Sequence, residues 1–256
     1  MSQNFFIFVF VLLSNLWVWK IFGQNLLLGL LLVSASVLLY RLIIHKGAEA
    51  LRYIFLVLFA LLLFSQWQTT QPSSLTLLDN DQKRVQQMRL NEYPPIGISI
   101  AGKKLWIPLA HWFEGRRETI AAFRIKKNFS EAIDPMLYFF ANHPRERVGV
   151  EEFEKFPYIL LPFFIFGIFS LSKKFRNKSL ALSLLAPLVL ISFIGNKNPL
   201  GPFSLFPFLA VATATGITKA YKKIALMPKN KFKPVLLALF ALFALVFLQV
   251  ISYAKY

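Results

Sequence analysis

The sequence predicts an all-α polytopic membrane protein, with about seven transmembrane helices and an extracytoplasmic cap of short helices between the third and fourth. Hydrophobic residues make up 56% of the chain, and the mean hydropathy is positive. They come in runs of about 17–22 residues, the length that spans a bilayer as a helix, whereas a soluble domain would interrupt them. One long polar segment divides the chain into residues 1–67, 68–155 and 156–256.

The first three spans precede the polar segment and cover about residues 4–21, 26–44 and 53–67. The first is expected to be one retained helix, because the N-terminus has no basic stretch and no small-residue cleavage pattern. Ser34-Ala35-Ser36 in the second span is a small-residue patch, which predicts close packing against another helix.

Two short helices and an ambiguous stretch are expected early in the polar segment. Asp79 is a good N-cap for a helix over residues 82–93, and Asp81 suits the positive end of its dipole. Residues 97–113 alternate and then become aromatic, so they form either a hairpin or a stretch lying on the membrane surface. A second helix is expected over residues 116–127.

The second of these helices is expected to place Ile120, Ala121 and Phe123 on one face. Asp134-Pro135 then opens a third short helix, with Asp as the N-cap and Pro at the first helical position.

The last four spans cover about residues 156–172, 179–195, 203–217 and 234–253. Each of the first three contains a proline. Pro162 predicts a kink whose freed carbonyl needs a neighbouring donor. The small-residue tail of the sixth span, Ala210–Gly216, is suited to close packing.

Basic residues are distributed unequally among the short turns. The turns after the second, fourth and sixth spans hold thirteen Lys and Arg, whereas the other turns and the C-terminal end hold three. An excess of basic residues marks the cytoplasmic side. We therefore expect a multi-pass protein of a prokaryotic plasma membrane, with its N-terminus in the cytoplasm and its C-terminus and polar segment outside.

The formal net charge of +17 does not predict nucleic-acid binding. Sixteen of the 29 basic residues lie outside the polar segment, and the segment itself is nearly balanced, with 13 basic and 11 acidic residues. This distribution fits contact with anionic lipid headgroups, so membrane lipids are the expected partners. The absence of ionisable residues from the core of every span argues against ion-coupled transport.

Asp79 and Asp81 are the candidate metal ligands. Paired carboxylates that hold a hard divalent cation suit phosphorylated substrates, so a divalent cation is the one cofactor that the residues suggest. The alternative is that both carboxylates only cap a helix. With no cysteine and only three histidines, one of them in a cytoplasmic turn, Cys-ligated and three-His metal sites are excluded.

Five basic residues around the second cap helix are candidates for binding a phosphate or a lipid headgroup, because guanidinium groups match phosphate geometry. The alternative is a solvated helix face, paired in part with Glu114 and Glu118. The five are Arg116, Arg117, Arg124, Lys126 and Lys127.

Asp134 and His143 are the candidate catalytic pair, since a carboxylate and an imidazole can act as acid and base. Capping and surface pairing are the alternative for both. Trp106 and Trp112 are candidate membrane-interface residues beside His111, either within an aromatic and basic patch or as simple anchors.

The C-terminal third resembles the membrane portion of polytopic glycosyltransferases that use polyprenyl-phosphate sugars, the GT-C group. The similarity rests on residues 156–162, the basic turn 173–178, and residues 199–207 with the small-residue helix that follows. It implies a polyprenyl-phosphate lipid as partner. That group carries an acidic motif between its first two spans, where this chain has a short turn without carboxylates. The resemblance thus implies a shortened, inactive or accessory relative.

Three functions remain open. The first is a glycosyltransferase-like protein that handles a lipid-linked or phosphate-bearing substrate at the outer surface, with metal- or Arg-stabilised departure of a lipid phosphate. The second is a non-catalytic subunit or scaffold bound to a membrane protein partner. The third is a small-solute transporter.

Overall fold

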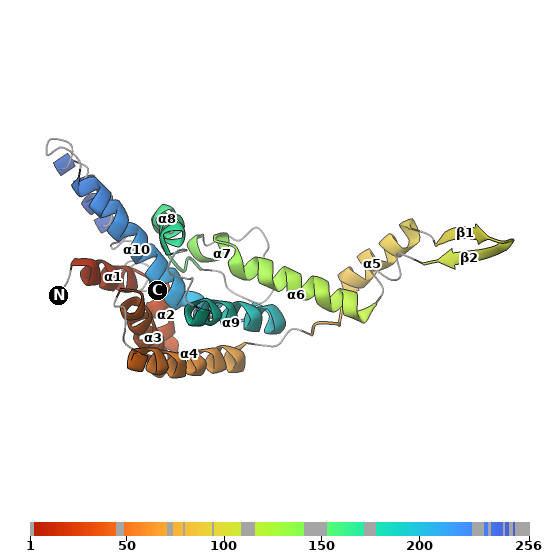
Figure 1. The fold of residues 1–256 in the computed structure, drawn as a ribbon, viewed down its shortest axis with the longest axis horizontal. Helices are drawn as coiled ribbons and strands as arrows, with labels where there is room; N and C mark the ends of the chain where they lie inside the picture. Colours follow the sequence, from red (N-terminus) through yellow and green to blue (C-terminus); the bar gives the residue numbers. More distant parts are fainter. Residues whose placement is uncertain are drawn as a thin grey trace.

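The computed structural model describes residues 3–44, 49–70, 74–78, 80–93, 95–108, 116–140, 153–171 and 178–226, with isolated pieces between residues 233 and 248. These residues are mostly helical. They form a body of packed helices, from which one long arm extends (Figure 1).

Within the described residues, three helices are long and apolar enough to cross a membrane: α3 (Leu26–Ile44), α4 (Glu49–Thr69) and the segment Phe203–Ala225. A bent pair near the N-terminus makes a fourth if it counts as one span. The bounds of α3 match the predicted second span, and α4 contains the third. Half of the residues of the predicted seventh span lie outside the described residues.

The predicted first span is not one helix. It consists of α1 (Gln3–Leu13) and α2 (Leu16–Gln24), which are bent by 59° at a short break. Asn15 Oδ1 accepts the backbone N–H of Trp17 at 2.9 Å and caps α2, while the indole of Trp19 donates to the carbonyl of Leu13 at 2.8 Å. These two side chains satisfy backbone groups that a break leaves exposed, which makes the break tolerable in an apolar environment.

The prolines of the later spans have different positions. Pro162 lies in the first turn of α8 (Leu161–Leu171), which follows a 3₁₀ turn over Tyr158–Leu160. A proline there breaks no helical hydrogen bond, so the predicted kink at Pro162 is wrong. Pro187 does lie inside α9 (Lys178–Ile194). Pro207 starts α10 (Phe206–Ala225), which continues past the predicted end at Ile217.

Helices α8 and α10 cross at two glycines. A Cβ atom at Gly167 would overlap the carbonyl oxygen of Ala212, and one at Gly216 would overlap that of Phe163. The two backbones are therefore in direct contact, which confirms the close packing predicted for the tail of the sixth span. In α3, Ala35 and Ser36 are buried, but Ser34 is exposed.

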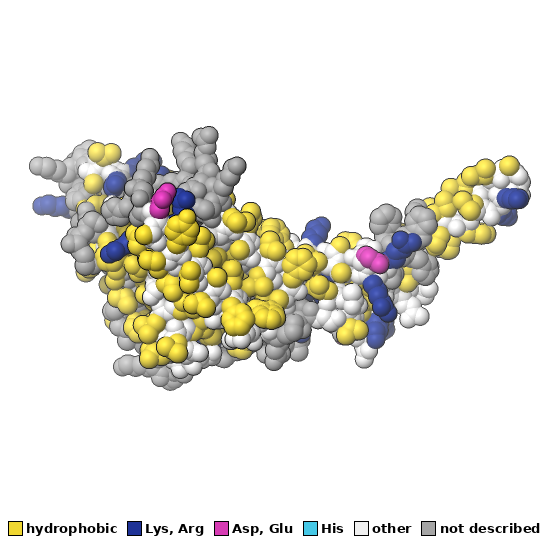
Figure 2. Space-filling view, turned by 60° about the horizontal axis from the view of Figure 1, so that its bottom comes forward, with side chains coloured by type: hydrophobic (Ala, Val, Ile, Leu, Met, Phe, Trp, Pro, Cys, Tyr) yellow, Lys and Arg dark blue, Asp and Glu magenta, His cyan; other side chains and the backbone are white. Residues whose placement is uncertain are grey.

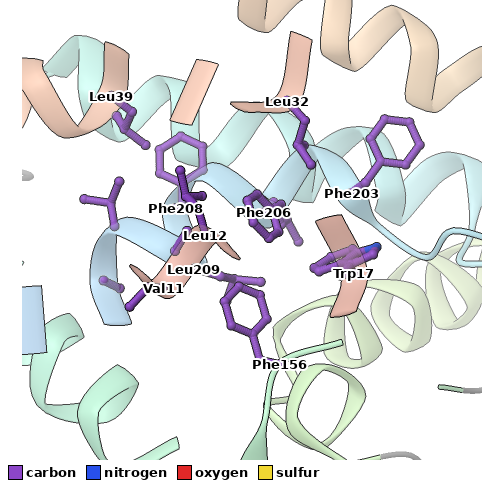
Figure 3. Close-up of a cluster of buried hydrophobic side chains, with 14 of the residues drawn as sticks. Val11, Leu12, Trp17, Leu32, Leu39, Phe156, Phe203, Phe206, Phe208 and Leu209 are labelled. Atoms are coloured by element: carbon purple, nitrogen blue, oxygen red, sulfur yellow. The ribbon is translucent and has the colours of Figure 1, made fainter. Parts of the chain in front are cut away.

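The core of the body surrounds Trp17, which is fully buried (Figure 3). Its ring lies 5.5 Å from that of Phe206, 6.1 Å from Phe156 and 5.9 Å from Tyr138, measured between centroids. Tyr138 belongs to α7 (Met136–Phe139), whose Leu, Tyr and Phe are all buried. The end of the predicted cap thus joins the core, because its sequence there is aromatic and apolar.

The rest of the polar segment forms the arm, which we define as the described residues between 74 and 133. It contains α5 (Asn80–Glu92), the antiparallel strands β1 (Ile96–Ile100) and β2 (Lys103–Ile107), and α6 (Arg117–Ile133). The arm extends away from the body instead of covering it, so the predicted cap is not a lid (Figure 1). The hairpin, which was one of two alternatives for this stretch, is confirmed; positive φ at Ala101 and Gly102 forms its two-residue turn.

Candidate functional site

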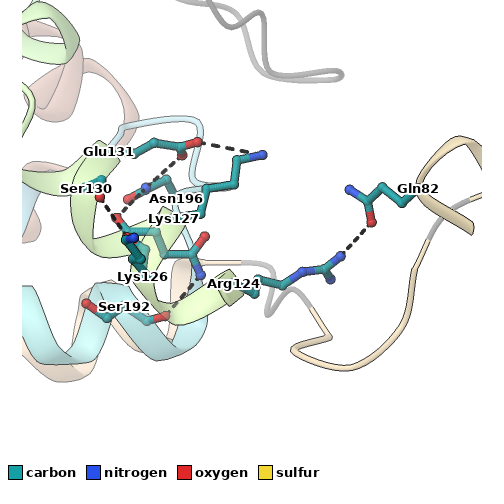
Figure 4. A network of polar contacts seen from close by, with 9 residues as sticks. Gln82, Arg124, Lys126, Lys127, Ser130, Glu131, Ser192 and Asn196 are labelled. Carbon is teal, nitrogen blue, oxygen red and sulfur yellow. Dashed lines mark hydrogen bonds and ion pairs between the residues drawn. The ribbon is translucent and has the colours of Figure 1, made fainter. Parts of the chain in front are cut away.

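The arm is attached to the body through polar side chains of α6. The buried Asn128 donates from Nδ2 to the carbonyl of Ser192 in α9 at 3.0 Å. Asn196 donates from Nδ2 to the carbonyl of Asn128 at 3.3 Å and to Glu131 Oε2 at 3.2 Å (Figure 4). Of the apolar residues predicted to share a face of this helix, Ile120 and Ala121 are half-buried, whereas Phe123 is 58% exposed. The neighbouring turn presents carbonyls and amides, so α6 buries polar residues against it.

The turn between α9 and α10 is held by Gln66 of α4, whose side chain is 1% exposed. Gln66 Nε2 donates to the carbonyl of Gly201 at 3.3 Å and to Thr70 Oγ1 at 3.0 Å. Its Oε1 accepts the backbone N–H of Ser204 at 3.2 Å. The Gln66 amide thus pairs with the backbone carbonyl of Gly201 and the backbone N–H of Ser204, both of which lie outside the α-helices. Backbone groups buried in an apolar environment need such partners.

Asn198 makes the second connection between α4 and this turn. Its Nδ2 donates to Thr69 Oγ1 at 2.9 Å and to Thr70 Oγ1 at 3.1 Å, while its Oδ1 accepts the N–H of Leu200 at 2.8 Å. The network therefore runs from α4 through the turn to α6. We call its side chains the polar joint: Gln66, Thr69, Thr70, Asn128, Glu131, Asn196 and Asn198.

Two further side chains connect the same turn to the core. The indole of Trp17 donates to the carbonyl of Leu200 at 2.5 Å. Lys155 is 2% exposed and donates from Nζ to the carbonyl of Leu137 at 3.0 Å. Its stem lies against Gly201, whose φ of +70° favours glycine. The body thus offers a rigid base for the arm.

The polar joint is not predicted from the sequence. The clearest indication in the sequence is the pair Asn196 and Asn198. Because this pair lies between glycines and prolines, it predicts only a polar turn. Gln66 sits at the end of an apolar run, where a polar residue is ordinary.

The predicted phosphate-binding residues do not form one cluster. Arg124 donates to the carbonyl of Ser74 and, at 2.9 Å, to Gln82 Oε1, so it ties α5 to α6 (Figure 4). Lys127 Nζ lies 3.9 Å from Glu131 Oε1, and its side chain is 58% exposed. Helical spacing places Arg117, Arg124 and Lys127 on one side of α6, near the exposed Arg116 that precedes it, whereas Lys126 lies on another side.

The described residues bring no metal site together: within them, no group of three or more His, Asp or Glu side chains is placed to hold an ion. Asp81 is exposed in the first turn of α5, and Asp79 lies outside the described residues. The divalent-cation pair stays a prediction.

Asp134 acts as a cap, since its Oδ1 accepts the N–H of Met136 at 2.9 Å. His143 and Trp112 lie outside the described residues. Trp106 is 62% exposed on β2 and packs over Gly97, where a Cβ would lie 3.2 Å from its ring. The proposed acid–base pair and the membrane-interface patch thus remain predictions.

No protein-family model, curated protein or solved structure matches this chain.

Glu154 lies where the chain returns from the polar segment to α8. Its Oε1 accepts the N–H of Tyr158 at 2.8 Å. Partial burial raises the pKa of the carboxyl above its ordinary value of 4.5, and the hydrogen bond from Tyr158 offsets part of that rise. The folded protein thus holds the Glu154 proton more tightly than the unfolded chain.

We expect the stability of the wild-type protein to fall as the pH rises from 4.5 through the raised pKa of Glu154, because the folded state binds more protons in that window. Glu154→Gln keeps the acceptor but removes the titration, so its stability should change less over the same range. Thermal unfolding in detergent at several pH values measures this. The exposed Glu118→Gln in α6 should retain the wild-type slope, and an unchanged slope in Glu154→Gln would contradict the assignment.

Proposed function

We propose that this chain is a membrane-embedded, non-catalytic subunit or scaffold of a protein assembly, and that its arm holds the partner. The observation that carries the proposal is the outer half of the arm. No described residue between 80 and 107 is buried, yet Val85, Met88, Ile98, Ile100 and Trp106 are large, apolar and exposed. Large apolar side chains that are exposed together, as Ile98 and Ile100 are on one face of the hairpin, mark an interaction site.

The arrangement of the arm supports the same proposal. Its base is fixed by the polar joint, and it leaves the body beside α9 and the end of α4 (Figure 1). With basic turns on the cytoplasmic side, these ends face outside, so the arm is displayed beyond the outer surface. A rigid base and an unpacked, apolar outer half suit a docking element more than an active site.

Three of the candidate catalytic and phosphate-binding residues have structural partners instead. Asp134 caps α7, Arg124 holds α5, and Lys127 pairs with Glu131. Because these three side chains already have partners within the arm or at its base, the non-catalytic function is favoured over the transferase.

The test replaces residues 80–107 with a short Gly-Ser linker and extracts both proteins gently from their own membrane. Native mass spectrometry should show the full chain with one protein partner at fixed stoichiometry, and the shortened chain without it. Gln87→Ala, on the exposed surface of α5, serves as the control and should keep the partner. Equal thermal unfolding midpoints would show that the body is intact. A full chain without any partner protein would contradict the proposal.

A second candidate is binding of a lipid-linked phosphate, as in the glycosyltransferase-like hypothesis. It is supported by the shared side of Arg117, Arg124 and Lys127 on α6. The same mass spectra test it. A polyprenyl phosphate that co-purifies with the full chain, and is lost when these three residues are changed to alanine, would favour this function.

A further inference from the structure

The hairpin of the arm has two unlike faces. Residues paired across the strands share a face, so the register Ile96↔Ile107, Ile98↔Leu105 and Ile100↔Lys103 makes one of them almost entirely apolar. The opposite face carries Gly97, Ser99, Lys104 and Trp106. Every residue of both strands is exposed except the half-buried Ile107. Nothing among the described residues covers the apolar face, which is visible along the end of the arm in Figure 2.

The two strands also have open edges. A hairpin of two strands is at best marginally stable alone, and an unpaired edge offers its N–H and C=O groups to another strand. Natural proteins protect such edges with lysine or proline. Here β2 carries Lys103 and Lys104, whereas β1 reads Ile-Gly-Ile-Ser-Ile and has no charge. The unprotected edge is therefore β1.

The charge of the hairpin specifies what can pair there. Residues 93–113 contain Lys103 and Lys104 but no carboxylate. An added strand would lie about 9–10 Å from β2, on the far side of β1. Lys104 faces Ser99 across the ladder, and because serine is short, the lysine side chain can reach over it toward that strand. An acidic side chain on this face would meet Lys104.

A lipid surface and a second copy of this chain fit the hairpin less well than an acidic strand. The arm carries the hairpin away from the end of α4, so it does not return to the bilayer that the spans would occupy (Figure 1). A second hairpin of this chain would bring two more lysines and no carboxylate.

From these features we infer that β1 is a docking edge for an extended segment of a partner protein in which apolar and acidic side chains alternate. The apolar side chains would lie beside the isoleucines of β1, the carboxylates would meet Lys104, and main-chain hydrogen bonds would join the segment to β1. This inference rests on the proposed function, since it specifies the chemistry of the partner that the arm would hold.

The test uses the full chain in lipid nanodiscs and labelled synthetic peptides. The probe alternates valine and glutamate; the controls replace glutamate with lysine, or place the same residues in two blocks. Fluorescence anisotropy should show tight binding of the alternating acidic peptide only. Ile98→Gln and Lys104→Glu should each weaken it at least tenfold, and Lys104→Glu should gain affinity for the lysine peptide. Lys83→Glu, the same charge change on the exposed surface of α5, should leave binding unaltered.

Equal binding of all three peptides, or binding indifferent to Ile98 and Lys104, would overturn the inference. An environment-sensitive dye on Ile98→Cys separates the other occupants. A buried dye without peptide in anionic nanodiscs would mean a lipid surface, and disulfide formation between copies of the unlabelled Ile98→Cys variant would mean self-association. Either result overturns the inference. The proposed function is tested separately. If the inference about β1 fails but removal of residues 80–107 still abolishes the native complex, the proposed function stands.

Discussion

Replacing Gly167 by leucine is expected to prevent the body from folding. Its Cβ would overlap the carbonyl oxygen of Ala212, which belongs to the backbone of α10 and cannot move without displacing that helix. Overpacking of a side chain into a filled core costs about 1–3 kcal/mol, and a clash with backbone lies at or above the upper end of that range. Gly216→Leu should have the same effect through the carbonyl of Phe163.

Fluorescence-detected size-exclusion chromatography of the detergent-extracted protein measures this effect. We expect the monodisperse peak of the wild type to be lost in Gly167→Leu. Gly23→Ala is the matched control, because nothing lies within 4 Å of a Cβ there and Gly23 is part of α2. Alanine favours a helix over glycine by about 1 kcal/mol, so this variant should be at least as stable as the wild type. A monodisperse Gly167→Leu protein with wild-type stability would show that α8 and α10 do not cross as described.

Replacing Gln66 by leucine is expected to loosen the turn that supports the arm. Leucine fills a similar volume but leaves the carbonyl of Gly201 and the N–H of Ser204 without the Gln66 amide. A buried backbone group that loses its partner costs about 1–3 kcal/mol, so the two together should lower stability by about 2–5 kcal/mol. The turn also holds Asn196 against α6, so the loss should extend to the base of the arm.

Hydrogen–deuterium exchange measures whether the loss of stability extends from the turn to the base of the arm. Peptides from the turn and from the second half of α6 should exchange faster in Gln66→Leu, while those from α8 should change less. Gln68→Leu is the control, since Gln68 lies two residues further along α4 and is exposed. Unchanged exchange in α6 would mean that Gln66 does not support the arm.

The apolar spans could be predicted from the sequence because their signal is local. The bounds of α3, the helix α5 and the alternation of the hairpin follow from hydropathy, from polar end residues and from a two-residue period. The break at Asn15 could not be predicted in this way. It depends on a cap by Asn15 and on an indole from the next turn, and each residue type also occurs in ordinary spans.

The candidate site was harder to predict, because its residues act through partners distant in the sequence. Asn128 bonds to Ser192, and Gln66 to residues of a turn more than a hundred positions away. In α6, the apolar side chain of Phe123 is exposed, although it shares the predicted face of Ile120 and Ala121. The residues of α6 that are buried, Asn128 and Glu131, are those that hydrogen-bond to Ser192 and Asn196. These partners come together only in the folded protein. Arg124 and Asp134 were selected for chemistry, and they serve as contacts of the arm and of α7.

The central claim is that a membrane-embedded body displays the arm outside the cell. The chain has no cysteine, so single cysteines can report its topology without background. We would place one at Ser99 in the hairpin and one at Lys222 near the end of α10, and label intact cells with a membrane-impermeant maleimide. The account predicts labelling of Ser99→Cys in intact cells and of Lys222→Cys only after permeabilisation. Labelling of Lys222→Cys in intact cells, with Ser99→Cys protected, would contradict it.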